Sequence, residues 1–198
     1  MLWILVVVGL LNTIAEGSPI PRPTDHAKVA RQLVHKASWT AFGTISSTFP
    51  KFEGFPMISV KSVADSPLNG PSTGNIYLLL TDLDFSAQDV KKNNKVTLLF
   101  SNEQDLSCSK VGVDPMEPTC ARTSITGSVI EIDDRNTEHA FAKDAFISRH
   151  PAAGQWIEGT HMFKLYKVKI ENIVVLDWYG GLHIVPTQKY FAVNPNDL

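Results

Sequence analysis

The chain has 198 residues, a hydrophobic fraction of 43% and a formal net charge of −2 at pH 7. This length predicts one domain with a sizeable core, and the hydrophobic fraction excludes a disordered chain. The 18 Lys and Arg against 20 Asp and Glu provide no basic face, which argues against direct nucleic-acid binding.

An apolar run, Leu2–Leu11, opens the chain. It is too short to span a bilayer as a helix, which needs about 20 apolar residues. We interpret residues 1–17 as a secretory signal peptide cleaved after Gly17, with a buried N-terminal strand as the alternative. Residues 18–23 then form an extended, proline-stiffened arm, and residues 24–198 form the folded domain.

The first predicted element of that domain is a helix that Thr24 caps and that runs to about Ser38, with Asp25 in its first turn. Small and apolar residues recur at helical spacing and indicate a buried stripe, whereas Arg31 belongs to the polar face that we expect to lie in water. The stripe consists of Ala27, Ala30, Leu33, Val34 and Ala37.

Two strands are predicted next. Residues Trp39–Ser46 alternate with period two, and so do residues 58–61. A long turn-rich connection over residues 65–75 follows them. The positions that share one face of the first strand are Trp39, Ala41, Gly43 and Ile45.

The stretch Ile76–Phe100 contains two short apolar runs separated by a polar segment. The runs Ile76–Leu80 and Val96–Phe100 are typical of strands buried on both faces. Between them, Ser86 is expected to cap a short helix that extends to Asn93. Because helix N-termini present free N–H groups to anions, this segment is the first candidate for a ligand site.

The only two cysteines, Cys108 and Cys120, flank a turn-rich loop. We predict that they form a disulfide, which would stabilise the fold by up to about 3 kcal/mol; two free thiols are the alternative. Neither cysteine belongs to a CxxC motif, so redox catalysis is not indicated.

The C-terminal half begins with a predicted strand over Arg122–Ile132, followed by a second long helix. This helix starts at Asp133 or Asp134 and is ended by Pro151. Its apolar stripe consists of Phe141, Ala142, Ala145 and Phe146.

A further strand covers Met162–Ile170, and Asn172 is expected to break its register. The Gly180–Gly181 pair allows a hairpin whose second arm is Leu182–Val185, and Pro186 opens a last short helix. With six or seven strands at short spacing and few complete βαβ units, the chain is mainly β, and an antiparallel or mixed barrel with peripheral helices is favoured.

No catalytic residue and no metal site emerge from the motifs. The nucleophile elbow, the dinucleotide-binding glycine motif and the phosphate-binding loop are all missing from the sequence. The histidines are scattered without HxxxH spacing, so each is expected to be structural, and a metal site would require assembly from distant segments. They are His26, His35, His139, His150, His161 and His183.

Three stretches carry a resemblance to a known family. They are FISRHPAAGQW (Phe146–Trp156), the loop from Cys108 to Cys120, and NIVVLDWYGG (Asn172–Gly181). Together they resemble the CREG family of small secreted glycoproteins, from about Val29 to Val193. The resemblance places the chain in the FMN-binding split-barrel superfamily, which includes the pyridoxamine-phosphate oxidases. It implies an α+β, mainly β fold, namely a six-stranded Greek-key split barrel with flanking helices, and a homodimer with ligand pockets at the subunit interface.

The resemblance also bears on the cofactor. In flavin-binding relatives, Arg-Lys or His-Thr side chains after the third strand hold the FMN phosphate, and here Ser86 and Ala87 match those positions. Each lost charged donor costs roughly 1.5–3 kcal/mol. We therefore expect no FMN and no enzymatic activity. The alternative is a flavin- or haem-binding oxidoreductase that holds its cofactor through Ser86, Lys91 and Arg122.

The resemblance implies a secreted or endolysosomal protein that regulates cell growth and differentiation through an unidentified protein receptor or partner. A nuclear corepressor that contacts other proteins is a third hypothesis, against which the signal peptide argues. No asparagine lies in an N-x-Ser/Thr sequon, so glycan-dependent binding to a sorting receptor is not expected.

Overall fold

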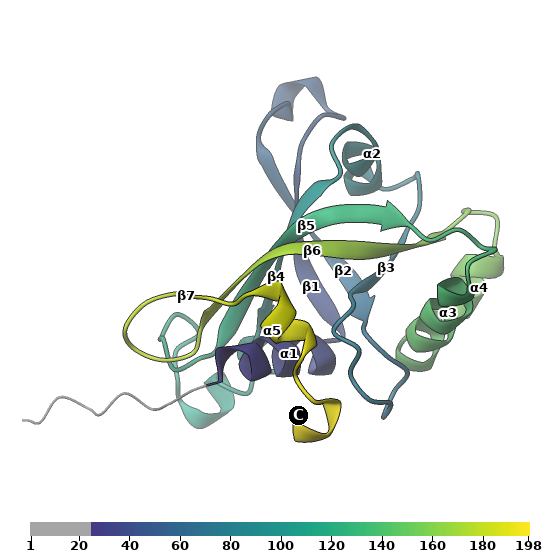
Figure 1. Cartoon of the computed structure of the whole chain (residues 1–198). Coiled ribbons are helices and arrows are strands. Elements are labelled where there is room, and N and C mark those ends of the chain that lie inside the picture. The colour runs from purple at the N-terminus through teal and green to yellow at the C-terminus, as the bar shows by residue number, and fades with distance from the viewer. Residues whose placement is uncertain (1–24) are drawn as a thin grey trace, which may run out of the picture.

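The computed structural model describes residues 25–198, and a closed antiparallel barrel lies at its centre (Figure 1). Its strands are β1 (Trp39–Ile45), β2 (Pro56–Ala64), β3 (Tyr77–Leu80), β4 (Lys95–Ser101), β5 (Arg122–Glu131), β6 (Lys164–Leu176) and β7 (His183–Ile184). The strand order is β3-β2-β1-β4-β5-β6-β7, and the pairing of β3 with β6 closes the ring and leaves β7 as the extra strand. The predicted six-stranded barrel is confirmed. The predicted signal peptide and arm lie outside the described residues.

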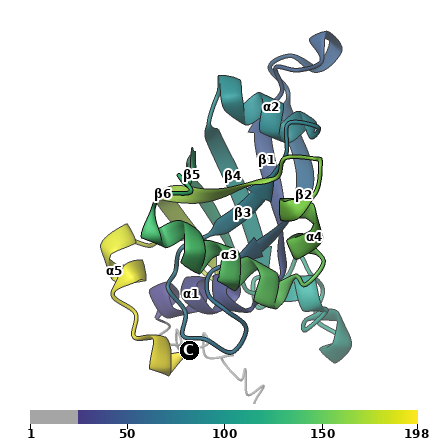
Figure 2. The same ribbon diagram turned by 90° about the vertical axis from the view of Figure 1, so that its right-hand side faces the viewer.

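Five α-helices surround the barrel in the described part of the chain. In Figures 1 and 2, α1 and α5 lie together at one end, α2 lies at the other end, and α3 and α4 cover one side. Within residues 25–198, no helix is long and apolar enough to cross a membrane. The helices are α1 (His26–Lys36), α2 (Phe85–Lys92), α3 (Thr137–Arg149), α4 (Ala153–Glu158) and α5 (Thr187–Phe191).

The two strands of the central stretch differ in burial. All four residues of β3 are buried, because one face lies in the barrel core and the other packs under α3. In β4, by contrast, burial alternates, and Leu99 is 40% exposed. The prediction that Val96–Phe100 is buried on both faces is therefore wrong, because within residues 25–198 the outer face of β4 lines a groove and is not covered by a helix.

Strand β1 turns its polar positions inward. Thr40, Phe42 and Thr44 are buried, whereas Trp39, Ala41, Gly43 and Ile45 lie on the outer face. The two threonine hydroxyls are satisfied inside the protein: Thr40 Oγ1 donates to the Leu99 carbonyl at 2.9 Å and Thr44 Oγ1 to Asp89 Oδ2 at 3.2 Å. The outer face of β1 is consequently free of polar side chains.

The three longest helices each have an aspartate or an asparagine as their N-cap residue. Asp25 caps α1, accepting from the amides of Ala27 and Lys28, and the expected cap Thr24 lies outside the described residues. Asp84, not Ser86, caps α2, because its carboxylate accepts from the Ser86 amide at 3.0 Å.

The second long helix begins later than predicted. Asn136 caps α3, whereas the expected starting residue Asp133 instead forms an ion pair with Arg135. Phe141 of the predicted stripe is 39% exposed and packs against the Tyr77 ring at 6.1 Å between centroids. Strand β6 likewise starts at Lys164 rather than Met162.

The predicted register break lies between β5 and β6. Thr126 pairs with Asn172 and Gly127 pairs with Ile170, so Glu171 is the extra residue of a bulge. At Gly127 a Cβ atom would lie 2.2 Å from the carbonyl oxygen of Lys169, which explains the glycine. Beyond the bulge β6 continues to Leu176 and pairs with β7, which confirms the predicted hairpin.

The prediction that Arg31 lies on the solvent-exposed face of the first helix is wrong. Its side chain is only 1% exposed, although the neighbouring Lys28, Gln32 and Lys36 are partly or fully exposed as expected. The helix α5 and the connection between β2 and β3 supply acceptors for its guanidinium, so this position of α1 is covered rather than solvated.

Candidate functional site

The N-terminus of α2, the predicted anion site, already holds a carboxylate. Asp84 Oδ1 accepts from the backbone amide of Ser86 at 3.0 Å and from its hydroxyl at 2.9 Å. Ser86 is fully buried, and Ala87 after it is 4% exposed. The donors that would hold a phosphate there are therefore used within the chain.

The charge at this end of α2 is also unfavourable for a phosphate. The ammonium group of Lys61 pairs with Asp84, so its positive charge is already matched. Burial raises the pKa of Asp84, but hydrogen bonds from Lys61 and the Ser86 amide outweigh burial and lower the pKa below its ordinary value. A phosphate would therefore meet an ionised carboxylate, and the residues at this helix end do not fit the phosphate of FMN.

The other two candidates for a phosphate site lie apart from each other. Lys91 forms an exposed ion pair with Asp82 at 2.6 Å. Arg122 pairs in register with Ser101, at the end of β4 that is remote from α2. At about 3.4 Å per residue, the length of β4 separates Arg122 from the α2 end by roughly 20 Å. The structure does not bring Ser86, Lys91 and Arg122 together around one ligand.

Arg122 instead holds the cysteine loop. Its two terminal nitrogens donate to the carbonyls of Pro115 and Met116, both at 3.1 Å, and of Glu117 at 3.2 Å. Cys108 and Cys120 form a disulfide across the same loop, with Cα atoms 5.7 Å apart. The guanidinium and the disulfide therefore stabilise one segment together.

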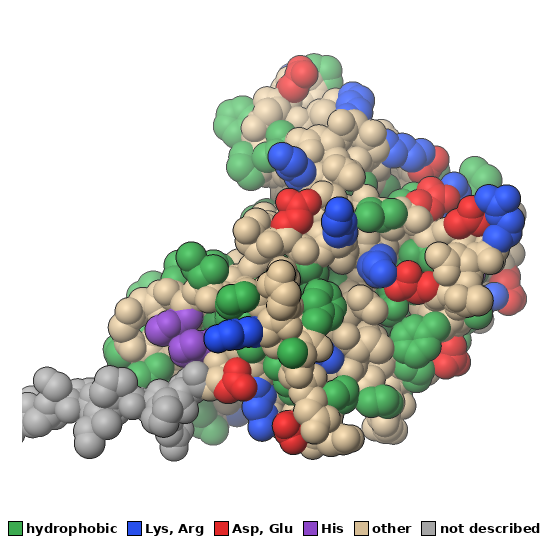
Figure 3. All heavy atoms as spheres, in the orientation of Figure 1, with side chains coloured by type: hydrophobic (Ala, Val, Ile, Leu, Met, Phe, Trp, Pro, Cys, Tyr) green, Lys and Arg blue, Asp and Glu red, His purple; other side chains and the backbone are tan. Residues whose placement is uncertain are grey.

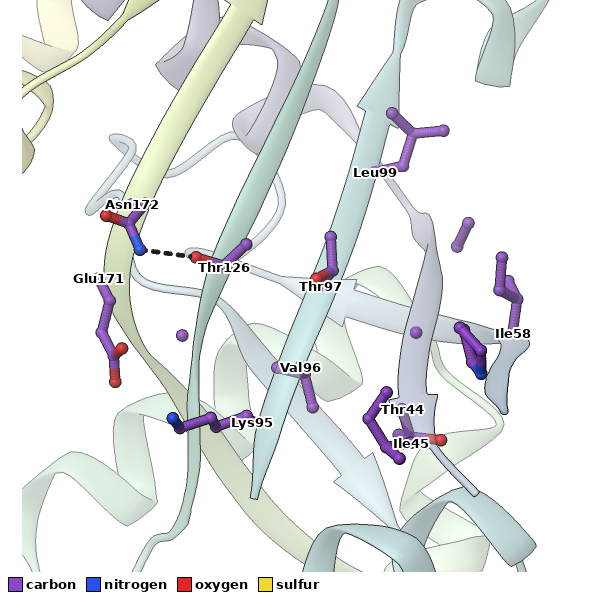
Figure 4. Close-up of a pocket in the computed structure, with 14 residues that line it drawn as sticks. Thr44, Ile45, Ile58, Lys95, Val96, Thr97, Leu99, Thr126, Glu171 and Asn172 are labelled. Carbon is purple, nitrogen blue, oxygen red and sulfur yellow. Dashed lines mark hydrogen bonds between the residues drawn. The ribbon is translucent and has the colours of Figure 1, made fainter. Parts of the chain in front are cut away.

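A groove of about 550 Å³ lies on the outer face of the sheet, across β1, β2, β4, β5 and β6 (Figure 4). The sequence alternation grouped several of its residues on one face but did not show that this face points out of the barrel. Its apolar lining consists of Ala41, Ile45, Pro56, Ile58, Val96 and Leu99.

The polar groups of the groove gather toward its β5–β6 side. Lys95 and Glu171 are the charged residues there, and Asn172 Nδ2 donates to Thr126 Oγ1 at 3.0 Å (Figure 4). Among the described residues that line the groove there is no histidine, cysteine or arginine. The lining thus lacks a nucleophile–base pair of the kind that histidine or cysteine forms.

Comparison with known proteins decides the family. The family model described as "CREG, beta-barrel" matches residues 21–192. The chain belongs to the CREG family. Protein CREG1 of Gallus gallus is 35% identical over 196 residues, covering 98% of this chain and all of that protein. Protein CREG2 of Mus musculus is 35% identical over 181 residues, covering 91% of this chain and 60% of that protein.

A solved structure supports the fold of this CREG-family protein. The heme binding protein of Mycobacterium smegmatis superposes with a TM-score of 0.67 at 16% identity, covering 88% of this chain and 63% of that one. At this identity the likeness shows the barrel fold alone.

Proposed function

We propose that this CREG-family protein is a secreted or endolysosomal homodimer without enzymatic activity, which regulates cell growth and differentiation through protein partners. The observation that carries the proposal is the apolar outer face of β1, β2 and β4. The solvent face of an antiparallel sheet is ordinarily polar, whereas exposed apolar patches mark interaction surfaces.

The register of the strands makes this face continuous. Ala41 lies between Val60 and Leu99, and Gly43 lies between Ile58 and Thr97. Ile58 and Val60 are 70% and 67% exposed. The occupant we propose is a second copy of the chain, because a two-fold axis would place the same apolar patch on both sides of one interface.

The absence of enzymatic activity is proposed on the chemistry of two places. The N-terminus of α2 holds Asp84 in the position of an anionic ligand. The groove on the outer face of the sheet is lined by aliphatic residues, glycines, threonines and one asparagine, with one lysine and one glutamate. Neither place offers an activated nucleophile, and neither gathers several free charged donors for a flavin phosphate, because Lys61 is paired with Asp84 and the groove contributes one lysine.

Secretion is supported by the disulfide and by the family. A disulfide between Cys108 and Cys120 is expected to persist in an oxidising compartment. The proposal does not include glycan-dependent receptor binding, because the sequence contains no N-glycosylation sequon. The receptor or partner is therefore expected to contact the polypeptide itself.

Sedimentation velocity at micromolar concentration tests the dimer. The wild-type protein should sediment as a dimer, and Ile58→Lys and Val60→Lys should sediment as monomers, because each places a charge in the interface. Leu68→Lys is the matched control, since Leu68 is 59% exposed but lies in the connection between β2 and β3. A wild-type monomer, or dimers of all three variants, would refute the interface.

An absorbance spectrum of the purified protein, followed by titration with FMN and with haem, tests the cofactor. We expect a colourless protein that binds neither group with micromolar affinity. Haem is included because the fold is similar to that of the mycobacterial heme binding protein. A flavin or Soret band would favour the alternative, an oxidoreductase with an atypical site.

A further inference from the structure

A cluster outside the groove joins three segments that are distant in the sequence. His26 opens α1, Asp177 follows the last residue of β6, and His183 begins β7. Their ligand atoms all lie within 4.8 Å of one another. Histidine side chains gather on the surface beside the β6–β7 hairpin in Figure 3, where solvent reaches them.

The two imidazoles are held against each other. The ring centroids of His26 and His183 are 3.8 Å apart, and the ring planes are inclined by 12°. His26 Nδ1 lies 3.0 Å from Asp177 Oδ2. Two stacked rings do not direct their lone pairs at one point, so metal binding requires one ring to turn about its side-chain bonds. Both rings are only partly buried.

The carboxylate supplies the second, independent observation. The side chain of Asp177 is only 4% exposed, and its Oδ1 atom has no hydrogen-bond partner among the described residues. A buried carboxylate oxygen without a partner is costly. Lys28 lines the same hollow beside α1 as Asp177, yet no ion pair joins them within residues 25–198. Asp177 Oδ1 is therefore available as a ligand atom for a cation.

We propose that His26, Asp177 and His183 bind a divalent transition-metal ion of the zinc class. Two imidazoles and one carboxylate are a common ligand set for Zn²⁺, with a water molecule completing four-coordinate geometry. The ion would link the start of α1 to the β6–β7 hairpin. This proposal is independent of the dimer interface and of the cofactor question.

The test is a titration of chelator-treated, dialysed protein with ZnCl₂ by calorimetry, and with CoCl₂ by visible absorption. We expect one Zn²⁺ per chain and a four-coordinate Co²⁺ spectrum. His183→Gln, His26→Gln and Asp177→Asn should each weaken binding more than about 10-fold. His161→Gln, at an exposed turn, is the matched control and should bind like the wild type.

Thermal unfolding distinguishes lost ligands from lost folding. Zn²⁺ at about 100 times its dissociation constant should raise Tm of the wild type by roughly 5–10 °C. His183→Gln should match the metal-free wild type in Tm and show no rise with zinc. Zinc affinity unchanged in His183→Gln, or wild-type affinity weaker than millimolar, would overturn the proposal.

Discussion

Arg31 and Tyr190 join the first and last α-helices of the described chain inside the protein. The guanidinium carbon of Arg31 lies 5.3 Å from the centroid of the Tyr190 ring, and Arg31 Nη1 donates to the Tyr190 carbonyl at 3.0 Å. Arg31 also donates from Nε to the Ser72 hydroxyl at 3.1 Å and from Nη2 to the Ser72 carbonyl at 2.8 Å. One buried cation thus ties α1, α5 and the connection between β2 and β3.

Arg31→Met should lower the free energy of unfolding by about 2–4 kcal/mol, because it leaves buried carbonyls of Ser72 and Tyr190 without donors. Urea unfolding measures the change. Lys28→Met, one turn earlier on the partly exposed side of α1, is the control and should change stability by less than about 0.5 kcal/mol. Equal effects of the two substitutions would mean that the buried hydrogen bonds contribute nothing measurable.

Gly74 makes room for the same guanidinium. A Cβ atom at Gly74 would lie 2.8 Å from Arg31, and the backbone has φ +77°. Gly54 has φ +80° but nothing within 4 Å of its position, so it is a matched control for backbone strain alone. Gly54→Ala should cost about 1–2 kcal/mol. Gly74→Ala should cost clearly more in the same urea experiment, and a cost equal to that of Gly54→Ala would contradict the tight contact.

Asp65 anchors a buried polar network at the end of β2. Its carboxylate accepts from Arg149 Nη2 at 3.0 Å and lies 3.0 Å from His35 Nδ1, and its side chain is fully buried. Burial raises the pKa of Asp65, but hydrogen bonds from His35 and Ser72 and the charge of Arg149 lower it below its ordinary value.

This lowered pKa sets the direction of a pH dependence. An unfolded aspartate has a pKa of about 3.9, so near this pH the folded protein binds fewer protons than the unfolded chain. The contribution of Asp65 to stability is therefore complete above about pH 4 and is lost as the pH falls through the lower folded pKa. Unfolding by urea at a series of pH values from neutral to acid should show this decline.

Asp65→Asn should destabilise the protein at pH 7 by about 3–5 kcal/mol, because it leaves the nearly buried Arg149 without its counter-charge. The variant should also lose stability less steeply in acid than the wild type. Asp144→Asn, which removes an exposed carboxylate, is the control and should be nearly neutral at pH 7. An unchanged acid slope in Asp65→Asn would exclude this residue as a source of the decline.

The double variant Cys108→Ser/Cys120→Ser should lose up to about 3 kcal/mol, since the disulfide closes a short loop with a sequence separation of 12. Adding Arg122→Gln should cost more, because Arg122 donates to several carbonyls of the same loop. Urea unfolding measures both steps, and thiol labelling of the untreated wild type checks the bridge. Labelling of both cysteines without reduction would contradict it.

Local patterns were sufficient for much of the fold. The stripe Ala27–Ala37 is buried as predicted, and the apolar run before Leu80 is a strand buried on both faces. The register break near Asn172 and the hairpin after Gly181 are confirmed as well. These features depend on residue spacing, glycine conformation and turn chemistry, which act over a few residues.

Features that depend on contacts between distant segments could not be predicted from these local patterns. Asp84, not Ser86, caps α2. Its carboxylate accepts from the helix amide and also pairs with Lys61 of β2, which is distant in the sequence. Ser86, Lys91 and Arg122 were candidates for one site, but Ser86 and Lys91 lie in α2, whereas Arg122 pairs with Ser101 at the opposite end of β4. Only barrel closure determines such separations.

The sequence by itself determined the barrel strands, the buried stripe of α1 and the family, because each follows from periodicity or from motifs carried in order along the chain. With two cysteines in the chain, it also offered a single possible disulfide. The tertiary structure alone decided that Arg31 is buried, that the apolar face of β1 points outward, and that His26 meets His183. The physical reason is that burial and proximity depend on which distant segments pack against a residue, and spacing within one segment carries no information about them.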